Sequence, residues 1–292
     1  MVQFQWHSDR QAVLALAQGF TGAIAARDEA IARCPAVEGH CPVCRRPTSF
    51  AVGTGAMFGP WPNLREGLRC AHCRLTARQR LVFLAMEQHI DASPVRRGAL
   101  LEQTTLLYRH AHARWPWLTG SEYLGERRIS GRHYWWSARG LRWRRLRHES
   151  ITRLSYPAGS LDLLVHSDVL EHVYELDLAL REGARVLRDG GVMLFTVPFF
   201  LDRSTSLLRG RPRADGSIEH IEAPEYHGDG VQRQGIYTFH CLGWDFPDRV
   251  RAAGFARLQF GLCHAPDEGL TAADPCGPAP RLGVPLVFRA TR

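Results

Sequence analysis

The chain has 292 residues, of which 45% are hydrophobic and 23% are charged, as is usual for a globular protein. This length suits one large domain or two modest ones, with a sizeable core. The formal charge is +8 at pH 7, but all 37 basic residues are arginine. We interpret this skew as codon bias. Because arginine also pairs well with carboxylates inside proteins, the excess alone does not indicate a nucleic-acid partner.

Neither a membrane span nor an export signal is predicted. The longest apolar run, residues 192–201, is about half the ~20 residues needed to cross a bilayer, and it contains Pro198. At the N-terminus, Asp9 and Arg10 precede any apolar core. We therefore expect a cytoplasmic protein with no membrane partner.

The first part of the chain, residues 1–37, is predicted to be an N-terminal helix. Apolar residues recur at helical spacing between residues 9 and 33, and Pro35 and Gly39 then end the pattern. A connecting helix followed by a linker is predicted for residues 76–97.

Between these helices, residues 38–75 hold two C-x2-C pairs and few aliphatic side chains. Such a segment cannot build a core of its own and needs a cross-link. Without an export signal, paired cysteines favour metal over disulfides, and four thiolates suit tetrahedral Zn²⁺ in a closed structural site. We predict a zinc ribbon, with His40 and His72 as competing ligands of lower rank. The predicted ligands are Cys41, Cys44, Cys70 and Cys73.

From residue 98 to residue 292, strands and helices alternate, which predicts an α/β domain with a doubly wound sheet. Residues 161–168 are almost continuously apolar, as is typical of a buried parallel strand. The last two strands are expected to form an antiparallel edge pair. Strands are predicted at 99–103, 119–125, 161–168, 192–199, 256–264 and 285–290, and helices at 108–115, 174–187 and 244–253.

The most specific pattern lies in residues 150–198. It comprises Asp162, Glu171, His172, Arg185, Leu187, Gly190 and Gly191, in that order. This string resembles the class I S-adenosylmethionine (SAM)-dependent methyltransferases of the type 11-like group. The stretches EQTT, GSEYLG and PEYHGD are similar to a bacterial subset of that family with an N-terminal zinc ribbon. The resemblance implies a Rossmann-like, seven-stranded methyltransferase sheet.

The resemblance also implies a SAM site beyond the carboxyl ends of the parallel strands. It assigns the ribose hydroxyls to Glu122 and the adenine to Ser150 and Ile151. The first loop of the family is usually rich in glycine, whereas here it reads LLEQTTLLYRH. The residues implied to contact SAM are Glu102, Glu122, Ser150, Ile151, His166 and Ser167.

Residues 202–246 form a polar stretch that is too long for a simple connector, and we predict a lid over the substrate. A hydroxyl acceptor needs a base, and histidine titrates near neutral pH. We predict His227 as this base and His172 as the second choice, while His240 is expected to be structural. The lid could instead bind a metal, although its sequence shows no clear ligand spacing.

The segment around residues 133–149 mixes aromatic residues with arginines. Stacking combined with charge is typical of single-stranded nucleic-acid sites, but an exposed surface in an arginine-rich protein has the same composition. We favour an anionic small substrate or a partner surface over RNA. The arginines are Arg132, Arg139, Arg142, Arg144, Arg145 and Arg147.

Three functions are therefore weighed. The leading hypothesis is a SAM-dependent methyltransferase of a small molecule, with a sugar or polysaccharide intermediate named by analogy only. The second is an RNA methyltransferase, which salt-sensitive RNA binding would identify. The third is a non-catalytic interaction protein that keeps the fold. No oligomeric state is predicted.

Overall fold

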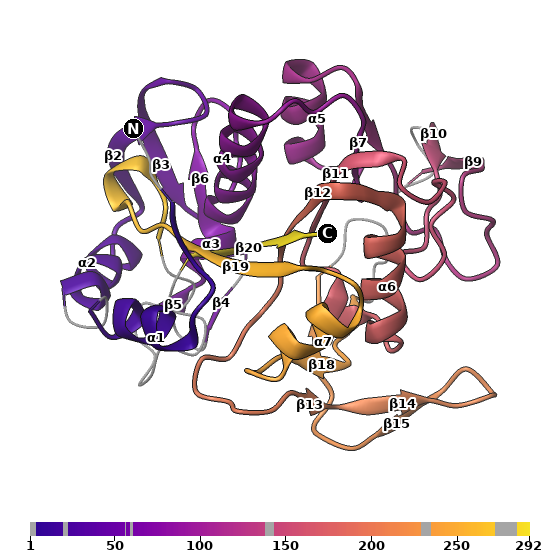
Figure 1. The fold of residues 1–292 in the computed structure, drawn as a ribbon. Helices are drawn as coiled ribbons and strands as arrows, with labels where there is room; N and C mark the ends of the chain where they lie inside the picture. The colour runs from indigo at the N-terminus through magenta and orange to yellow at the C-terminus, as the bar shows by residue number, and fades with distance from the viewer. Residues whose placement is uncertain are drawn as a thin grey trace. The chain divides into compact units, whose positions relative to one another are not determined.

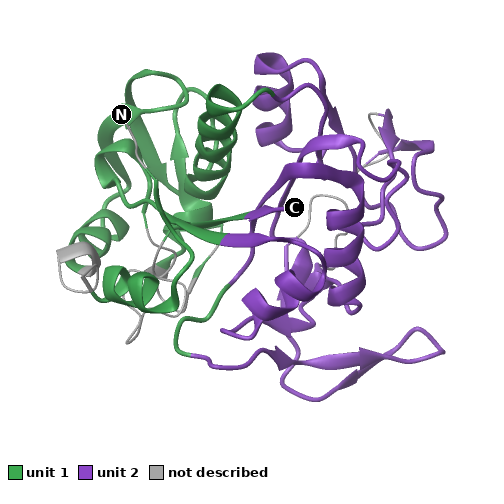
Figure 2. Ribbon diagram, in the orientation of Figure 1, with its two compact units in different colours: residues 1–94, 199–202, 259–289 green, residues 95–198, 203–258, 290–292 purple. Residues whose placement is uncertain are grey.

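The computed structural model describes residues 4–19, 23–55, 57–58, 61–137, 143–228, 235–271 and 285–292. The chain forms two compact units, shown in different colours in Figure 2. Unit 1 comprises residues 1–94, 199–202 and 259–289, and unit 2 comprises residues 95–198, 203–258 and 290–292.

The largest sheet has seven strands in the order β1-β19-β20-β12-β11-β7-β8 (Figure 1). β11 pairs in parallel with both β12 and β7, and β7 pairs in parallel with β8. This mixed sheet confirms the predicted Rossmann-like fold class. The strands are β1 (Gln5–His7), β7 (Gly98–Leu100), β8 (Leu118–Gly120), β11 (Leu161–Ser167), β12 (Leu187–Thr196), β19 (Arg257–Leu262) and β20 (Leu286–Thr291).

One prediction for the chain ends was wrong. β19 is not an edge strand, because β1 pairs with it in antiparallel register, so the last two strands do not form the edge pair that we expected. The segment predicted as an N-terminal helix contains α1 (Arg10–Gly19) and α2 (Ala23–Ala32), and residues 20–22 between them lie outside the described residues. The Asp9 carboxylate caps α1 by accepting the N–H of Ala12 at 2.8 Å.

The helices of unit 2 lie where the apolar spacing predicted them, to within a few residues. α6 buries Leu176, Leu180 and Ala184, which form the stripe that indicated the helix. A short 3-10 helix, η1 (Leu170–His172), follows β11. The α-helices of this unit are α5 (Leu106–Arg114), α6 (Leu176–Val186) and α7 (Phe246–Ala252).

The predicted lid consists mainly of two-stranded antiparallel ribbons, and its residues 229–234 lie outside the described residues. The β14–β15 ribbon extends away from the body of unit 2 (Figure 1). The lid strands are β13 (Leu207–Leu208), β14 (Gly210–Pro212), β15 (Ile218–His220), β16 (Tyr226–His227), β17 (Ile236–Tyr237) and β18 (His240–Cys241). A further ribbon of unit 2 pairs β9 (His133–Trp136) with β10 (Arg144–Arg147).

Unit 1 contains a three-stranded antiparallel sheet in the segment predicted as a ribbon. Its strands are β2 (Ala36–Cys41), β3 (Arg46–Val52) and β6 (Leu68–Cys70), accompanied by β4 (Met57–Phe58), β5 (Trp61–Pro62), α3 (Leu64–Gly67), α4 (Ala77–Ala92) and the 3-10 helix η2 (Pro266–Glu268). Thr76 caps α4 with a complete capping box. Across the described part of the chain, no helix has the length and apolar character needed to span a membrane.

Asp162 anchors the start of the central strand β11. Its Oδ2 atom accepts the backbone N–H groups of Arg96 and Arg97 at 2.8 and 2.9 Å, and its other oxygen pairs with Arg188. Burial alone would raise the pKa of Asp162, but the hydrogen bonds from Arg188 and from the two N–H groups lower it below the usual value. The ionised carboxylate therefore stabilises the fold.

We expect Asp162→Ala to lower the free energy of unfolding by about 2 kcal/mol at pH 7, because several hydrogen bonds to a charged acceptor are lost. Since the folded-state pKa of Asp162 is lowered, its stabilisation is present above the unfolded value of about 3.9 and disappears as pH falls through the folded value. Urea unfolding should therefore show the difference from wild type shrinking below about pH 4.

The matched control is Asp189→Ala, since the Asp189 side chain is 99% exposed. It should change the free energy of unfolding by less than about 0.5 kcal/mol. Equal effects of the two substitutions at pH 7 would rule out Asp162 as an anchor.

Candidate functional site

The parallel strands bring most of the predicted cofactor residues to one edge of the sheet in unit 2. β8, β7 and β11 are neighbours and run in the same direction, so their carboxyl ends lie together. His166 and Ser167 end β11, and Glu122 follows β8 by two residues. Ligands of open α/β sheets bind at such an edge.

Glu122 holds the loop after β7. Its Oε1 atom accepts hydrogen bonds from the backbone N–H of Gln103 at 2.8 Å and from the N–H and hydroxyl of Thr104, both at 2.7 Å. The Thr105 hydroxyl then caps α5 by accepting the N–H of Tyr108. A carboxylate and a helix cap thus fix this loop, which has no glycine. Glu102 is half-buried in the same loop.

Ser150 and Ile151 lie on a backbone segment next to Glu122. A parallel bridge joins Glu122 to His148, and the N–H of Glu149 donates to the Glu122 carbonyl at 3.1 Å. The Ser150 hydroxyl is 2.9 Å from the Thr152 hydroxyl, and Ile151 is buried. The structure therefore places the residues predicted to contact ribose and adenine on neighbouring backbone segments. Their roles in binding SAM stay predictions.

His166 and Ser121 are buried polar residues at this edge. The His166 ring stacks on Phe195 with centroids 5.1 Å apart, and burial lowers its pKa to about 3, so the ring is neutral. Among the described residues, neither ring nitrogen of His166 nor the Ser121 hydroxyl has a hydrogen-bond partner. Most buried polar groups are paired, so these atoms indicate an edge built for a polar ligand.

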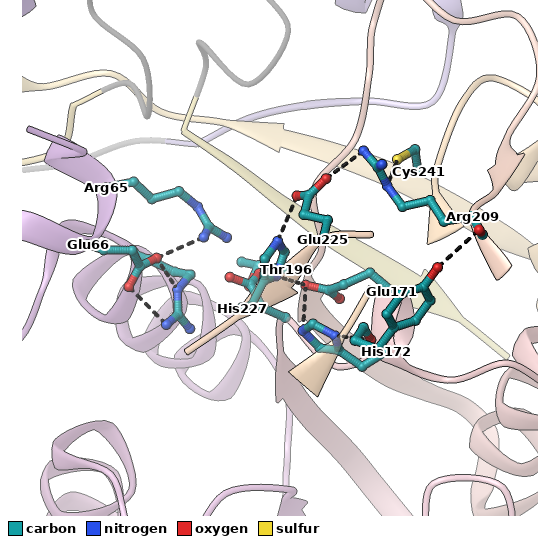
Figure 3. Close-up of polar contacts among 12 residues, drawn as sticks. Arg65, Glu66, Glu171, His172, Thr196, Arg209, Glu225, His227 and Cys241 are labelled. Carbon is teal, nitrogen blue, oxygen red and sulfur yellow. Dashed lines mark hydrogen bonds and ion pairs between the residues drawn. The ribbon is translucent and has the colours of Figure 1, made fainter. Parts of the chain in front are cut away.

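The two histidines predicted as bases lie together, although His172 belongs to η1 and His227 to β16. Their rings are perpendicular with centroids 4.9 Å apart. Both face the carboxylate of Glu171, whose side chain is 0% exposed: Oε1 is 3.7 Å from Nε2 of His172 and 3.8 Å from Nδ1 of His227 (Figure 3). We call these three residues the Glu-His-His cluster.

The remaining ring nitrogens of the cluster have hydrogen-bond partners of their own. Nδ1 of His172 lies 2.9 Å from the carbonyl oxygen of Tyr237, and Nε2 of His227 lies 3.0 Å from Oε1 of Glu225. Arg209 pairs with the other Glu225 oxygen at 2.5 Å. The hydrogen bond from His227, opposed in part by burial and aided by the charge of Arg209, lowers the pKa of Glu225. Both imidazole rings are thereby oriented.

His240 and the arginine-rich segment have other surroundings. His240 is buried with Nε2 at 3.1 Å from the Tyr174 carbonyl, and burial lowers its pKa, as suits the structural role expected for it. The arginine-rich segment forms the β9–β10 ribbon, near which Trp135 and Trp143 are 68% and 63% exposed. The predicted contributors Arg139 and Arg142 lie outside the described residues.

In unit 1 the four cysteines of the two C-x2-C pairs converge. The Cys41 and Cys73 sulfurs are 3.8 Å apart, as are those of Cys44 and Cys70. Tetrahedral zinc with ~2.3 Å bonds separates its sulfur ligands by about 3.8 Å, so this donor set fits zinc. Metal-free, the thiol of Cys73 lowers the pKa of Cys41 to about 5.

Both cysteine knuckles have the same backbone geometry. Arg45 and Arg74, each directly after the second cysteine of its pair, have φ of 57° and 63°. Their N–H groups donate to the carbonyls of Cys41 at 2.7 Å and Cys70 at 3.0 Å. A positive φ is uncommon outside glycine, so these two turns are specific features of the cysteine site.

Arg80 is a residue of the cysteine site that sequence reasoning missed. It is fully buried in α4 and donates to the carbonyls of Leu75, Leu68 and Gly269. Its guanidinium also lies 4.6 Å from the centroid of the Phe50 ring. Burial lowers its pKa, whereas the nearby cysteine thiolates raise it. An arginine in a polar stretch of sequence gives no sign of burial, because arginine is mostly exposed.

Comparison with known proteins supports the family indicated by the sequence. The model of the methyltransferase domain family matches residues 133–195. A Mycolicibacterium smegmatis protein named "Probable S-adenosylmethionine-dependent methyltransferase" is 31% identical over 134 residues, which are 44% of this chain and 52% of that protein. The chain thus spans about half the length of the curated relative that it matches.

The solved structures that the chain matches include a SAM-dependent methyltransferase from Mesorhizobium loti, with a TM-score of 0.39, 13% identity, and coverage of 74% of this chain and 98% of that one. They also include the 1,6-didemethyltoxoflavin-N1-methyltransferase of Burkholderia thailandensis, with a TM-score of 0.37, 14% identity, and coverage of 74% and 78%. The sequence matches thus show that residues 133–195 are similar to a methyltransferase domain, and the mixed sheet has the fold predicted for that family.

We predict that the purified protein contains one zinc ion per chain, held by the four converging cysteines. Cys41→Ser and Cys73→Ser should lose the ion and destabilise unit 1 by several kcal/mol, because metal-binding free energy is folding free energy at such sites. Elemental analysis and thermal unfolding are the measurements. Cys34→Ser is the control, since Cys34 is exposed and outside the two pairs. A metal-free protein with undiminished thermal stability would contradict the zinc site.

Proposed function

We propose that this protein is a SAM-dependent methyltransferase that acts on a small molecule. The observation that carries the proposal is the edge formed by the ends of β8, β7 and β11, which holds Glu122, the buried polar atoms of Ser121 and His166, and, just beyond β11, the Glu-His-His cluster. Cofactor-side and acceptor-side groups are thus supplied by the same region of unit 2.

The cofactor side fits SAM by the chemistry of its residues. Glu122 offers a carboxylate for ribose hydroxyls, and Ser150 with the buried Ile151 offers a polar group and apolar cover for adenine. When bound, SAM supplies an electrophilic methyl group. The work left to the protein is to align the acceptor with that methyl group, to exclude water and to handle the proton of the acceptor.

We assign the acceptor side to the Glu-His-His cluster and to the surrounding lid, residues 202–246. His172 comes from η1 and His227 from the lid strand β16. The Phe239 N–H donates to the Glu171 carbonyl at 2.7 Å, which fastens the lid to η1. His227, with His172 beside it, is the group that we propose to act on the proton of the acceptor. A sugar or polysaccharide intermediate remains our proposal for the acceptor, by analogy.

RNA is the second candidate acceptor, favoured by one observation. Trp135 and Trp143 are exposed beside the arginines of the β9–β10 ribbon, a combination that suits stacking against bases. Binding of single-stranded RNA that weakens steeply with added salt, and that is lost in Trp135→Ala, would favour this candidate over the small molecule.

We expect calorimetry to detect binding of SAM and of S-adenosylhomocysteine (SAH) to the wild-type protein. Glu122→Ala should weaken SAH binding by about 10- to 150-fold, as expected when hydrogen bonds to a charged group worth about 1.5–3 kcal/mol are lost. Because Glu122 also holds the loop after β7, Glu122→Gln is the sharper variant. It keeps an acceptor oxygen for the loop and removes only the charge.

Glu126→Gln is the matched control, since Glu126 is exposed in the same connection after β8. It should bind SAH like the wild type. If Glu122→Gln and Glu122→Ala also bind SAH like the wild type, the ribose site lies elsewhere. If the wild-type protein binds neither SAM nor SAH, the proposed activity is wrong.

A further inference from the structure

We propose that Glu171, His172 and His227 bind a divalent transition-metal ion, separate from the ion of the cysteine site. Three observations lead to this site: the spacing of the donor atoms, the partners of the outer ring nitrogens, and the burial of the carboxylate. The use of the ion in methyl transfer rests on the proposed function, whereas its binding does not.

The spacing of the donor atoms suits a shared ion. Glu171, His172 and His227 each offer one ligand atom, and the three atoms lie within 4.8 Å of one another. The 3.7 and 3.8 Å separations of Oε1 of Glu171 from Nε2 of His172 and Nδ1 of His227 are too long for hydrogen bonds. Neighbouring ligands of one ion, bound at about 2.1 Å, lie roughly 3.0–3.5 Å apart, so the three side chains would have to move closer together to bind the ion.

The outer nitrogens of both rings have the partners expected of metal-bound histidines. A ligating histidine usually donates its other N–H to a carbonyl or a carboxylate, which fixes the tautomer and the ring orientation. His172 has the Tyr237 carbonyl at 2.9 Å and His227 has Glu225 at 3.0 Å, and Arg209 in turn holds Glu225. In both rings the other nitrogen is the one that faces Glu171 (Figure 3).

Charge and donor type indicate which ion would bind. The Glu171 side chain is 0% exposed, and a cation bound beside it would favour the charged form of the carboxylate in these surroundings. Two imidazoles and one carboxylate suit Mn²⁺, Fe²⁺, Co²⁺ or Zn²⁺ better than Mg²⁺, which prefers oxygen ligands alone. Three protein ligands also leave coordination positions open, in contrast to the four cysteines of unit 1.

Such an ion would bind the acceptor through its hydroxyl oxygen and lower the pKa of that hydroxyl. The proton passes to water, and a lone pair of the oxygen forms the new bond to the methyl carbon. The carbon–sulfur bond of SAM breaks, and its electron pair stays on the sulfur of SAH. With the ion bound, His172 and His227 act as its ligands, and the base role proposed above for His227 applies only to the protein without the ion.

The test is titration with Mn²⁺ of protein that carries one zinc ion per chain, in the cysteine site, followed by the electron paramagnetic resonance signal of the free Mn²⁺. Mn²⁺ is the probe because thiolates bind it poorly, so the cysteine site does not interfere. We expect saturable binding of one Mn²⁺ per wild-type chain. His172→Ala and His227→Ala should each weaken it at least tenfold, and Glu225→Gln, which alters only the partner of a ligand, should weaken it about 10- to 100-fold.

His220→Ala is the matched control, because His220 is an exposed lid histidine outside the cluster, and it should bind Mn²⁺ like the wild type. His227→Gln, with thermal unfolding of every variant, shows whether a loss of binding reflects a loss of fold. Failure of the wild type to bind Mn²⁺, or undiminished binding in folded His172→Ala and His227→Ala, would overturn the site. SAH calorimetry separates the two proposals, since Mn²⁺ binding without SAH binding contradicts only the proposed function.

Discussion

The parallel pairing of β11 with β12 and β7 is the constraint on which the rest of unit 2 depends. Leu163, Leu164 and Val165 are fully buried, so the strand carries no functional group along its middle. Its chemistry is confined to the two ends, with the Asp162 anchor at the start and polar residues after Val165. Because neighbouring parallel strands end at the same edge, this one strand decides where the residues proposed for the cofactor and the acceptor meet.

The turn after β11 delivers the Glu-His-His cluster. Asp168 has a φ of 52°, which is uncommon outside glycine, and its N–H donates to the Thr196 carbonyl at 2.9 Å. The Thr196 hydroxyl returns a 2.8 Å hydrogen bond to the Asp168 carboxylate. The end of β12 thus holds the turn in a strained conformation, and η1 starts directly beyond it with Glu171 and His172. Strain of this kind concentrates at functional sites.

Much of the fold could be predicted, because buried strands and amphipathic helices leave periodic apolar patterns. The cysteine cluster could also be predicted from the sequence, since the four cysteines form two C-x2-C pairs. The Glu-His-His cluster was not, although both histidines were candidates, because His227 reaches Glu171 only through short ribbons of two-residue strands that leave no periodic signal. β1 was also missed, because a strand of three residues leaves no periodic signal. The burial of Arg80 was missed because only the folded structure shows the backbone carbonyls to which its guanidinium donates.

The central claim is that one edge of the sheet holds SAM and presents its methyl group to the Glu-His-His cluster. A crystal structure of the protein with SAH tests it most directly. The account predicts the ribose at Glu122, the adenine at Ser150 and Ile151, and the sulfur directed toward Glu171, His172 and His227. SAH bound away from the ends of β8, β7 and β11, or with its sulfur directed away from that cluster, would contradict it.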